Sequence, residues 1–187
     1  MTTAGKTLTR ERSFTRDAKK LLLGEGETFH GEAILAVTKA LLQSGVSYVG
    51  GYPGAPVSHL LDVLADASES VLGPYGIHFE QSASEAGAAA MLGASIHYPI
   101  RGAVTWKSIV GTNVASDALS NLASAGVVGG ALIVVGEDYG EGASVIQERT
   151  HATALKSSMP LIDPRYDMST IVDLVEKGFE LSETSHL

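Results

Sequence analysis

The sequence predicts an α/β domain built as a parallel sheet with helices on both faces, and therefore in three layers. Three observations support this prediction. Short apolar runs alternate along the chain with segments of helical periodicity, these runs lack the polar alternation of a half-exposed strand, and 44% of the 187 residues are apolar. Strands that are apolar on both faces are typical of parallel sheets covered by helices, and this apolar content is enough for a real core.

The first half of the chain predicts two helices and two strands. The helices are indicated by apolar residues at helical spacing and by their ends, since Gly45 terminates the first and Pro56 suits the first position of the second. In chain order we expect a helix over 29–44, a strand over 46–51, a tight turn over 52–56, a helix over 56–67 and a strand over 75–80.

The second half continues the alternation. Its clearest strand is GALIVVG at 130–136, which is short, continuously apolar and rich in β-branched residues. We expect a helix over 83–97, a strand over 101–106, a helix over 114–124, the strand over 130–136, a helical stretch over 144–157, a fifth strand at 161–162 and a helix over 168–182. The sequence stops directly after this last helix, where an α/β unit normally delivers another strand. We therefore expect a C-terminally incomplete domain, a fragment of a longer protein.

Charge divides the chain into two parts. Residues 1–20 contain six basic and two acidic residues, a charge of +4, whereas residues 21–187 contain 7 basic and 19 acidic residues, a charge of -12. We expect a basic flexible arm over 1–20 and an α/β domain over 21–187. The acidic domain excludes nucleic acid as the main partner. No run of 18 apolar residues occurs, so no membrane span is expected.

Cysteine is absent from the sequence. This excludes disulfides, a thiol nucleophile, cysteine-ligated zinc and iron–sulfur clusters within the chain, and it fits a cytoplasmic protein. The six histidines show no HxH or HExxH spacing, so no metal site is expected. The GxGxxG, complete P-loop and GxSxG patterns are missing as well, which disfavours a flavin- or nucleotide-binding domain and a hydrolase.

Ligands of open parallel sheets bind beyond the carboxyl ends of the strands, so the residues that follow each expected strand are the candidates. Glu85 is the most interesting of them, because it begins a helix of alanines and glycine whose small side chains let another surface come close. By pattern alone a structural role is favoured. Ser82 and Glu85 have the spacing of a capping box, with the serine at the N-cap and the glutamate three residues later. The two roles are compatible, since a capped glutamate is also a well-positioned one.

Several motifs, taken in order, resemble one family. They are KLLLG at 20–24, GYPGAP at 51–56, Ser84-Glu85 with its small-residue helix, WK at 106–107 leading to GTNVASD at 111–117, and GGALIVV at 129–135. Together they resemble the N-terminal pyrimidine-binding (Pyr) domain of thiamine-diphosphate 2-oxoacid:ferredoxin oxidoreductases, above all that of the indolepyruvate ferredoxin oxidoreductase alpha subunits. The resemblance runs from about residue 20 to the end of the sequence.

The resemblance implies a role for Glu85. In this family a glutamate of the Pyr domain makes a hydrogen bond to N1' of the cofactor's pyrimidine. This hydrogen bond promotes loss of the C2 proton of the cofactor, which precedes oxidative decarboxylation of a 2-oxo acid. Glu85 matches the position of that glutamate. Further implied residues are Tyr52, Pro53, Gly111 and Asn113 for the cofactor, and Ala55, Ser58, Lys107 and Ser108 for the substrate. The sequence departs from the family at Ala55, which stands where the family has a threonine. The hydroxyl of Ser58, one helical turn later, would partly take the place of the missing threonine hydroxyl.

The same resemblance implies that the chain is half of an active site. In the family another domain with a GDG motif, which this sequence lacks, holds the diphosphate and Mg²⁺, and iron–sulfur clusters need cysteines on other domains or subunits. We expect as partners a diphosphate-binding domain or subunit and, through the whole enzyme, ferredoxin or another electron acceptor, in a homo-oligomer. The isolated chain is expected to be inactive. The alternative is a non-catalytic α/β domain for oligomerisation or regulation that kept the fold but not the chemistry.

Overall fold

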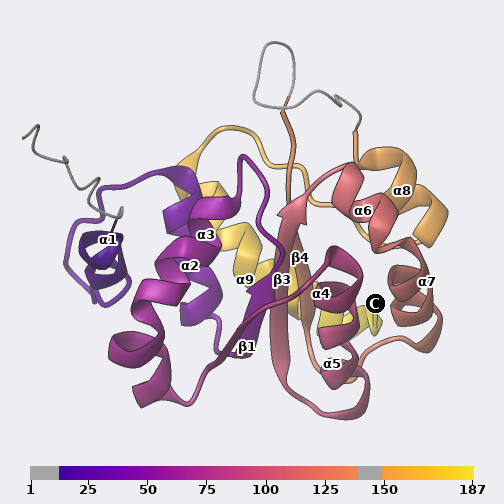
Figure 1. Cartoon of the computed structure of the whole chain (residues 1–187), viewed down its shortest axis with the longest axis horizontal. Helices are drawn as coiled ribbons and strands as arrows, with labels where there is room; N and C mark the ends of the chain where they lie inside the picture. The colour runs from indigo at the N-terminus through magenta and orange to yellow at the C-terminus, as the bar shows by residue number, and fades with distance from the viewer. Residues whose placement is uncertain (1–12, 139–148) are drawn as a thin grey trace, which may run out of the picture.

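The computed structural model describes residues 13–138 and 149–187. Its centre is a sheet of four parallel strands in the order β2-β1-β3-β4 (Figure 1). The strands are β1 (Val46–Gly51), β2 (His78–Gln81), β3 (Arg101–Lys107) and β4 (Ala131–Gly136). Because all four run the same way, their carboxyl ends lie at one edge of the sheet. The predicted α/β class with a parallel sheet is confirmed.

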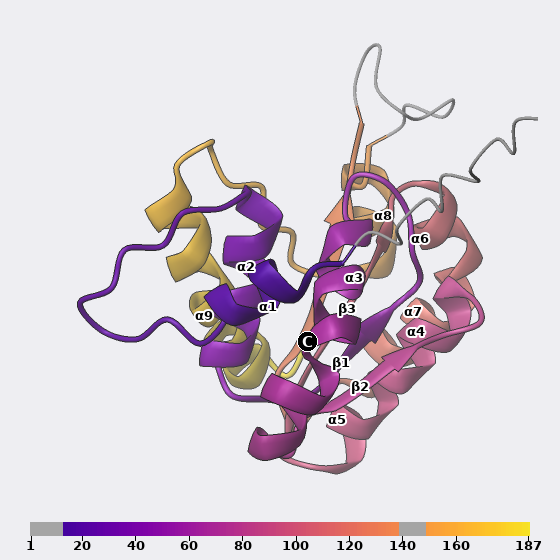
Figure 2. The same ribbon diagram turned by 60° about the vertical axis from the view of Figure 1, so that its left-hand side comes forward.

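Helices cover both faces of the sheet and make the expected three layers (Figure 2). One face carries α2 (Ala33–Gln43), α3 (Ser58–Ala67) and α9 (Met168–Ser185), and the other carries α4 (Glu85–Met91), α5 (Gly93–His97) and α7 (Ser116–Ala125). The remaining helices are α1 (Thr15–Lys20), α6 (Val110–Val114), α8 (His151–Ser157), a π-helix over Ser68–Leu72 and a 3₁₀ turn over Gly73–Tyr75. Gly45 ends α2 with a φ of 75°, the left-handed conformation that suits glycine.

The domain has one hydrophobic core on each face of the sheet, because successive side chains of a strand point to opposite faces. On the first face Val49 packs with leucines of α3 such as Leu61 and Leu64, all at most 1% exposed. On the second face Tyr48 and Trp106 pack against α4, α5 and α7. Full burial of one such side chain stabilises the fold by about 2 kcal/mol. Burial also raises the pKa of the Tyr48 hydroxyl, which hydrogen-bonds to the Ser95 hydroxyl at 2.6 Å.

Several predicted boundaries differ from the structure. The helix expected over 83–97 divides into α4 and α5 at Leu92, next to Gly93, a poor helix former. The helix expected over 114–124 is preceded by α6, whose β-branched residues weaken its helical signal. α3 begins at Ser58, two residues after Pro56, and β2 begins at His78 because a 3₁₀ turn precedes it. In the helical stretch expected over 144–157, residues 144–148 lie outside the described residues, and the observed helix is α8 at 151–157.

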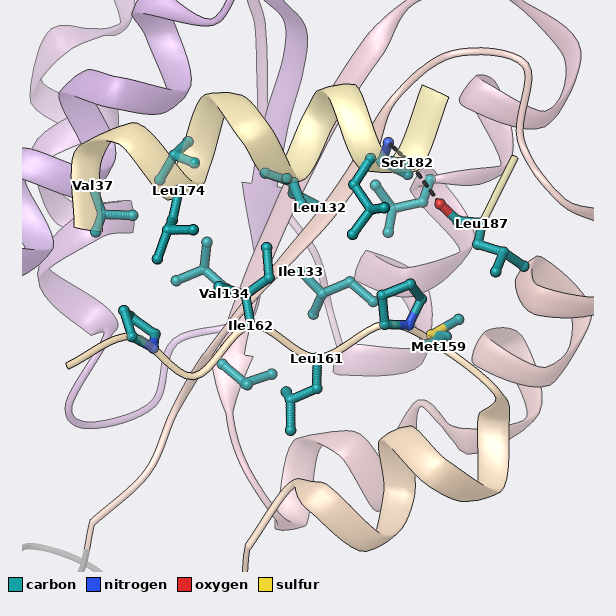
Figure 3. Close-up of a pocket in the computed structure, with 18 of the residues that line it drawn as sticks. Val37, Leu132, Ile133, Val134, Met159, Leu161, Ile162, Leu174, Ser182 and Leu187 are labelled. Atoms are coloured by element: carbon teal, nitrogen blue, oxygen red, sulfur yellow. Dashed lines mark hydrogen bonds between the residues drawn. The ribbon is translucent and has the colours of Figure 1, made fainter. Parts of the chain in front are cut away.

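The fifth strand expected at 161–162 is wrong. Leu161 and Ile162 are irregular and line an apolar cavity of about 320 Å³ beside β4, together with side chains of α9 (Figure 3). They lie between Pro160 and Pro164, which cannot donate backbone hydrogen bonds to a ladder. Among the described residues, β4 is therefore paired on one side only, by β3.

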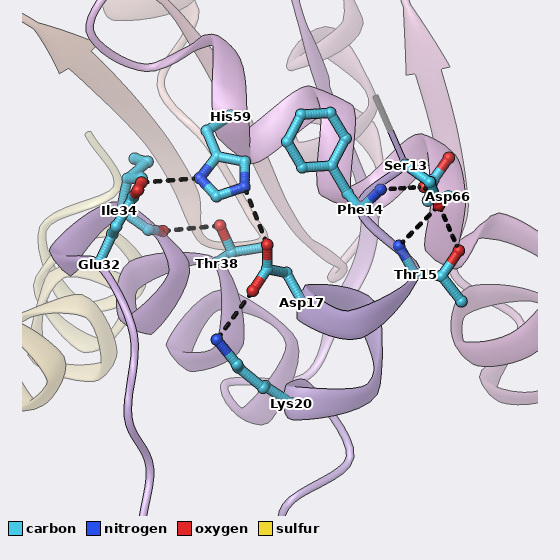
Figure 4. A network of polar contacts seen from close by, with 10 residues as sticks. All are labelled: Ser13, Phe14, Thr15, Asp17, Lys20, Glu32, Ile34, Thr38, His59 and Asp66. Atoms are coloured by element: carbon cyan, nitrogen blue, oxygen red, sulfur yellow. Dashed lines mark hydrogen bonds and ion pairs between the residues drawn. The ribbon is translucent and has the colours of Figure 1, made fainter. Parts of the chain in front are cut away.

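The N-terminal segment also differs from the expected flexible arm. Residues 1–12 lie outside the described part, but residues 15–20 form α1, which packs on α3 (Figure 4). Phe14, Ala18 and Leu21 have helical spacing and join the first core, an amphipathic pattern that the charges of this segment obscure. The Phe14 amide donates to Asp66 at 2.6 Å. A hydrogen bond from Lys20 at 2.8 Å, with a smaller contribution from His59, holds the pKa of Asp17 below its usual value.

Candidate active site at the carboxyl edge of the sheet

Glu85 lies at the carboxyl edge of the sheet as the first residue of α4, and it is only 8% exposed. The expected capping box of Ser82 and Glu85 is wrong. Ser84 is the N-cap, and its hydroxyl accepts a hydrogen bond from the Gly87 amide at 3.2 Å. The helix starts later than the pattern suggests because the chain is still bound along the sheet at Ser82, whose amide donates to the Gly51 carbonyl at 2.9 Å. The cap therefore does not use the Glu85 carboxylate.

No other interaction occupies the Glu85 carboxylate: among residues 13–138 and 149–187 it makes neither a hydrogen bond nor an ion pair. Its side chain lies against Gly111 of α6. A β-carbon on Gly111 would stand 2.9 Å from Cγ of Glu85 and 2.6 Å from Cδ1 of Trp106, so only glycine fits between them. Trp106 is fully buried below. The Glu85 carboxylate is therefore available to a ligand that binds at this edge of the sheet.

The turn after β1 is tied to the end of β3. The Tyr52 amide donates to the Thr105 carbonyl at 3.0 Å, and Gly54 packs so closely on Lys107 that a β-carbon would stand 2.6 Å from Cβ of the lysine. The Lys107 ammonium donates to the Ala55 carbonyl at 2.7 Å and to Asp138 at 2.8 Å. The lysine is therefore already paired, and it joins the turn to the residues that follow β4.

Ser108 belongs to a buried polar cluster next to this turn. It is 2% exposed, its amide donates to the Gly136 carbonyl at 2.9 Å, and its hydroxyl lies 2.6 Å from that of Thr150. The backbone amide and the hydroxyl of Thr150 both donate to the Glu137 carboxylate. The Thr112 hydroxyl lies 3.4 Å from that of Ser108. The sequence did not single out Thr112, Thr150, Glu137 or Asp138; the position of the last two directly after β4 was the available signal.

The predicted site residues thus fall into two groups. Glu85 and Gly111 contact one another, and the turn that contains Tyr52, Pro53 and Ala55 is bound to Lys107. The remaining three are Ser108 in the buried cluster, Ser58 half-buried at the start of α3, and Asn113 exposed on α6. All of them lie on segments that follow the carboxyl ends of strands, as the sequence predicts.

In the part of the chain that the structure describes, no three His, Cys, Asp or Glu side chains are placed to hold a metal ion together. No described helix is both long and apolar enough to cross a bilayer.

Relatives in sequence were found by comparison with curated proteins, although no protein-family model matches the chain. Indolepyruvate oxidoreductase subunit IorA of Methanothermobacter thermautotrophicus is 30% identical over 148 residues, which are 79% of this chain and 23% of that protein. The subunit of the same name from Pyrococcus horikoshii is 28% identical over 158 residues, 82% of this chain and 24% of the relative. The chain belongs to the 2-oxoacid:ferredoxin oxidoreductase family. It spans about a quarter of the length of these relatives.

A solved structure of this family shares the fold. 2-Oxoglutarate:ferredoxin oxidoreductase from Magnetococcus marinus superposes with a TM-score of 0.60 over 81% of this chain and 27% of its own, at 17% sequence identity. That protein has 2-oxoglutarate, coenzyme A and succinyl-CoA bound. At this identity the likeness concerns the fold alone. The predicted fold is therefore confirmed by this structure, and the predicted family by the relatives in sequence.

Proposed function

We propose that this chain supplies the pyrimidine-binding half of a thiamine-diphosphate site in a 2-oxoacid oxidoreductase of the indolepyruvate type, which carries out oxidative decarboxylation of a 2-oxo acid. The observation that carries the proposal is Glu85, a carboxylate that is 8% exposed and has no partner among the described residues. It lies at the edge where ligands of parallel sheets bind. A pyrimidine nitrogen is a suitable partner for it, because the two groups can share one proton.

The chain's own residues would hold and orient the pyrimidine. Glu85 keeps a proton at N1', Gly111 leaves room for close approach, and Tyr52, Pro53 and Asn113 are the proposed contacts around the ring. When bound, thiamine diphosphate would supply the carbon nucleophile and the electron sink that decarboxylation of a 2-oxo acid requires. The low exposure of Glu85 would strengthen its interaction with the pyrimidine once the ring covers the carboxylate.

The 2-oxo acid is proposed to bind beside the turn that follows β1, where Ala55, Ser58, Lys107 and Ser108 gather. The ammonium of Lys107 is paired with Asp138, and the hydroxyl of Ser108 points into the buried cluster. Two of the three N–H donors of Lys107 are thus already used, by the Ala55 carbonyl and by Asp138. We therefore propose direct contacts from Ala55 and Ser58, while Lys107 and Ser108 hold the shape of the site.

The rest of the reaction is proposed to lie outside this chain. A diphosphate-binding domain or subunit would supply the Mg²⁺ ligands, iron–sulfur clusters would lie on other domains or subunits, and ferredoxin or another acceptor would take the electrons, in a cytoplasmic homo-oligomer. The isolated chain should then be inactive. Phosphate needs backbone amides or cations, and Mg²⁺ needs oxygen ligands, and we propose that the other domain supplies both. Calorimetry with Mg²⁺ should therefore detect no tight site for thiamine diphosphate on the chain alone. Submicromolar binding would contradict the half-site.

The central test is Glu85→Gln in the complete oxidoreductase. Glutamine cannot exchange a proton with N1', so hydrogen–deuterium exchange at C2 of bound thiamine diphosphate should slow on the order of a hundredfold. Stability should change by about 0.5 kcal/mol or less, through weaker attraction to the helix dipole. Glu80→Gln, which replaces an exposed carboxylate of β2, is the matched control.

The alternative function is a non-catalytic domain for oligomerisation or regulation. It is favoured by Ala55, which leaves the turn after β1 without the hydroxyl of the family's threonine. The same variant separates the two hypotheses. If Glu85→Gln exchanges C2 as fast as the parent, the catalytic role of Glu85 is wrong and the non-catalytic function stands.

A further inference from the structure

Trp106 is the only tryptophan of the chain, and it is fully buried under the site. A buried indole N–H needs an acceptor, because leaving it unpaired forfeits a hydrogen bond. The acceptor is the hydroxyl of Thr112, 3.1 Å from Nε1. Thr112 is itself 3% exposed and lies in the middle of α6, so this hydrogen bond joins the helix to the end of β3.

The hydrogen bonds continue in one direction from this pair. The Thr150 hydroxyl donates its hydrogen to the Glu137 carboxylate, which can only accept. The Thr150 hydroxyl therefore accepts its second hydrogen bond, from the Ser108 hydroxyl. Ser108 then accepts from Thr112, and Thr112 accepts from Trp106. Each hydroxyl donates once and accepts once. Such a chain, which ends on a charge, holds its members more firmly than isolated pairs would.

The position of α6 depends on this chain of hydrogen bonds. α6 has five residues, too few for a helix to be stable by itself, so its place is set by its contacts. Gly111 of the same turn lies between the indole ring and the Glu85 side chain, with no space for even one more carbon on either side. Any movement of α6 is therefore transmitted directly to Glu85.

We propose that Trp106 and Thr112 are positioning residues for Glu85: the Trp106–Thr112 hydrogen bond fixes α6, and α6 fixes the carboxylate. The inference rests on the proposed function, because the position of Glu85 matters only if the carboxylate acts on a ligand. Neither residue needs to touch the cofactor. A displacement of Glu85 by a fraction of an ångström slows the reaction through geometry alone.

The first experiment uses Thr112→Val, which keeps the size of the side chain and removes the acceptor. In the 187-residue chain the single indole N–H gives one ¹⁵N–¹H resonance. Its exchange with D₂O should accelerate on the order of tenfold in Thr112→Val. Thr112→Ser should restore the parent rate, because it returns the hydroxyl. Thr38→Val is the matched control: Thr38 is also buried, but its hydroxyl bonds within α2 on the opposite face of the sheet.

The second experiment measures C2 exchange of thiamine diphosphate in the complete oxidoreductase. Thr112→Val should slow it on the order of tenfold, while Thr112→Ser and Thr38→Val behave like the parent. If Glu85→Gln abolishes exchange but Thr112→Val exchanges normally, the positioning role is overturned and the proposed function survives. If Glu85→Gln has no effect, the proposed function itself fails. Should Thr112→Val not fold, Trp106→Phe, which removes the N–H and part of the ring, replaces it in the C2-exchange experiment with the same expected loss.

Discussion

Two carboxylates flank β3 at its opposite ends, and their surroundings differ. At the amino end Glu183 of α9 meets Arg101, which donates to both carboxylate oxygens at 2.6 and 2.8 Å. Arg101 also donates to the Ser44 carbonyl at 2.8 Å and stands over the Phe179 ring, 5.3 Å from its centroid. At the carboxyl end Glu85 is more deeply buried, yet it has no partner among the described residues.

The difference shows which carboxylate serves the fold and which is available for chemistry. A paired and hydrogen-bonded charge has its desolvation offset by its neighbours, and the pair fixes the elements that carry it. The Arg101 hydrogen bond accordingly holds the pKa of Glu183 below its usual value, and Glu183 in turn raises the pKa of Arg101. The Glu85 carboxylate has no such pairing among the described residues, so it is the one of the two that is available to a ligand.

The largest effect on stability is expected for Arg101→Met. The change leaves Glu183 without its partner and the Ser44 carbonyl without a donor, so unfolding in urea should become easier by about 2 kcal/mol. Lys177→Met, an exposed cation on α9, should stay within about 0.5 kcal/mol of the parent. In the complete oxidoreductase Arg101→Met should leave C2 exchange unchanged. Slow exchange with normal stability would remove the distinction between the two ends of β3.

The second prediction concerns pH. A lowered pKa in the folded state means that Glu183 stabilises the protein above its unfolded pKa, and that this stabilisation is lost as pH falls through the lower folded value. Glu183→Gln should therefore cost about 1 kcal/mol at pH 7, a value limited by partial exposure of the side chain. The difference between parent and variant should shrink below about pH 4. Denaturation curves across this range test it, and a constant difference would mean that the charge contributes nothing.

Much of the fold could be predicted because its signals are local. The strand at 46–51 matches β1, and GALIVVG at 130–136 matches β4 to within one residue, since a buried parallel strand is a short apolar run. The run at 161–162 is apolar as well, but it contacts β4 through side chains and lies between two prolines. Apolar content alone does not distinguish a strand from a segment that covers one.

The site was predicted less completely, because its contacts join residues far apart in the sequence. Glu85 could be found from its position after a strand and from the family motif. The hydrogen bond from Lys107 to Asp138 spans 31 residues, and the one between Ser108 and Thr150 spans 42, so no local pattern indicates either. The sequence shows Trp106 only as part of the WK motif, and the structure adds a hydrogen bond to Thr112 that composition does not reveal.

The smallest predicted effect tests the cap that frees Glu85. Both Ser82 and Ser84 are suitable N-cap residues, and only the tertiary bond from the Ser82 amide to Gly51 decides between them. Ser84→Ala should cost about 0.7 kcal/mol, the lower part of the usual range for a cap, because α4 is short. Ser82→Ala should cost almost nothing, since its hydroxyl caps no helix.

The two serines therefore separate the two possible helix starts. Equal losses, or a larger loss for Ser82→Ala, would restore the capping box and give Glu85 a structural hydrogen bond after all. The comparison with Glu183 would then disappear, because both carboxylates would be partnered. A loss confined to Ser84→Ala leaves the Glu85 carboxylate without a role in the helix, and therefore available for the proposed contact with the pyrimidine.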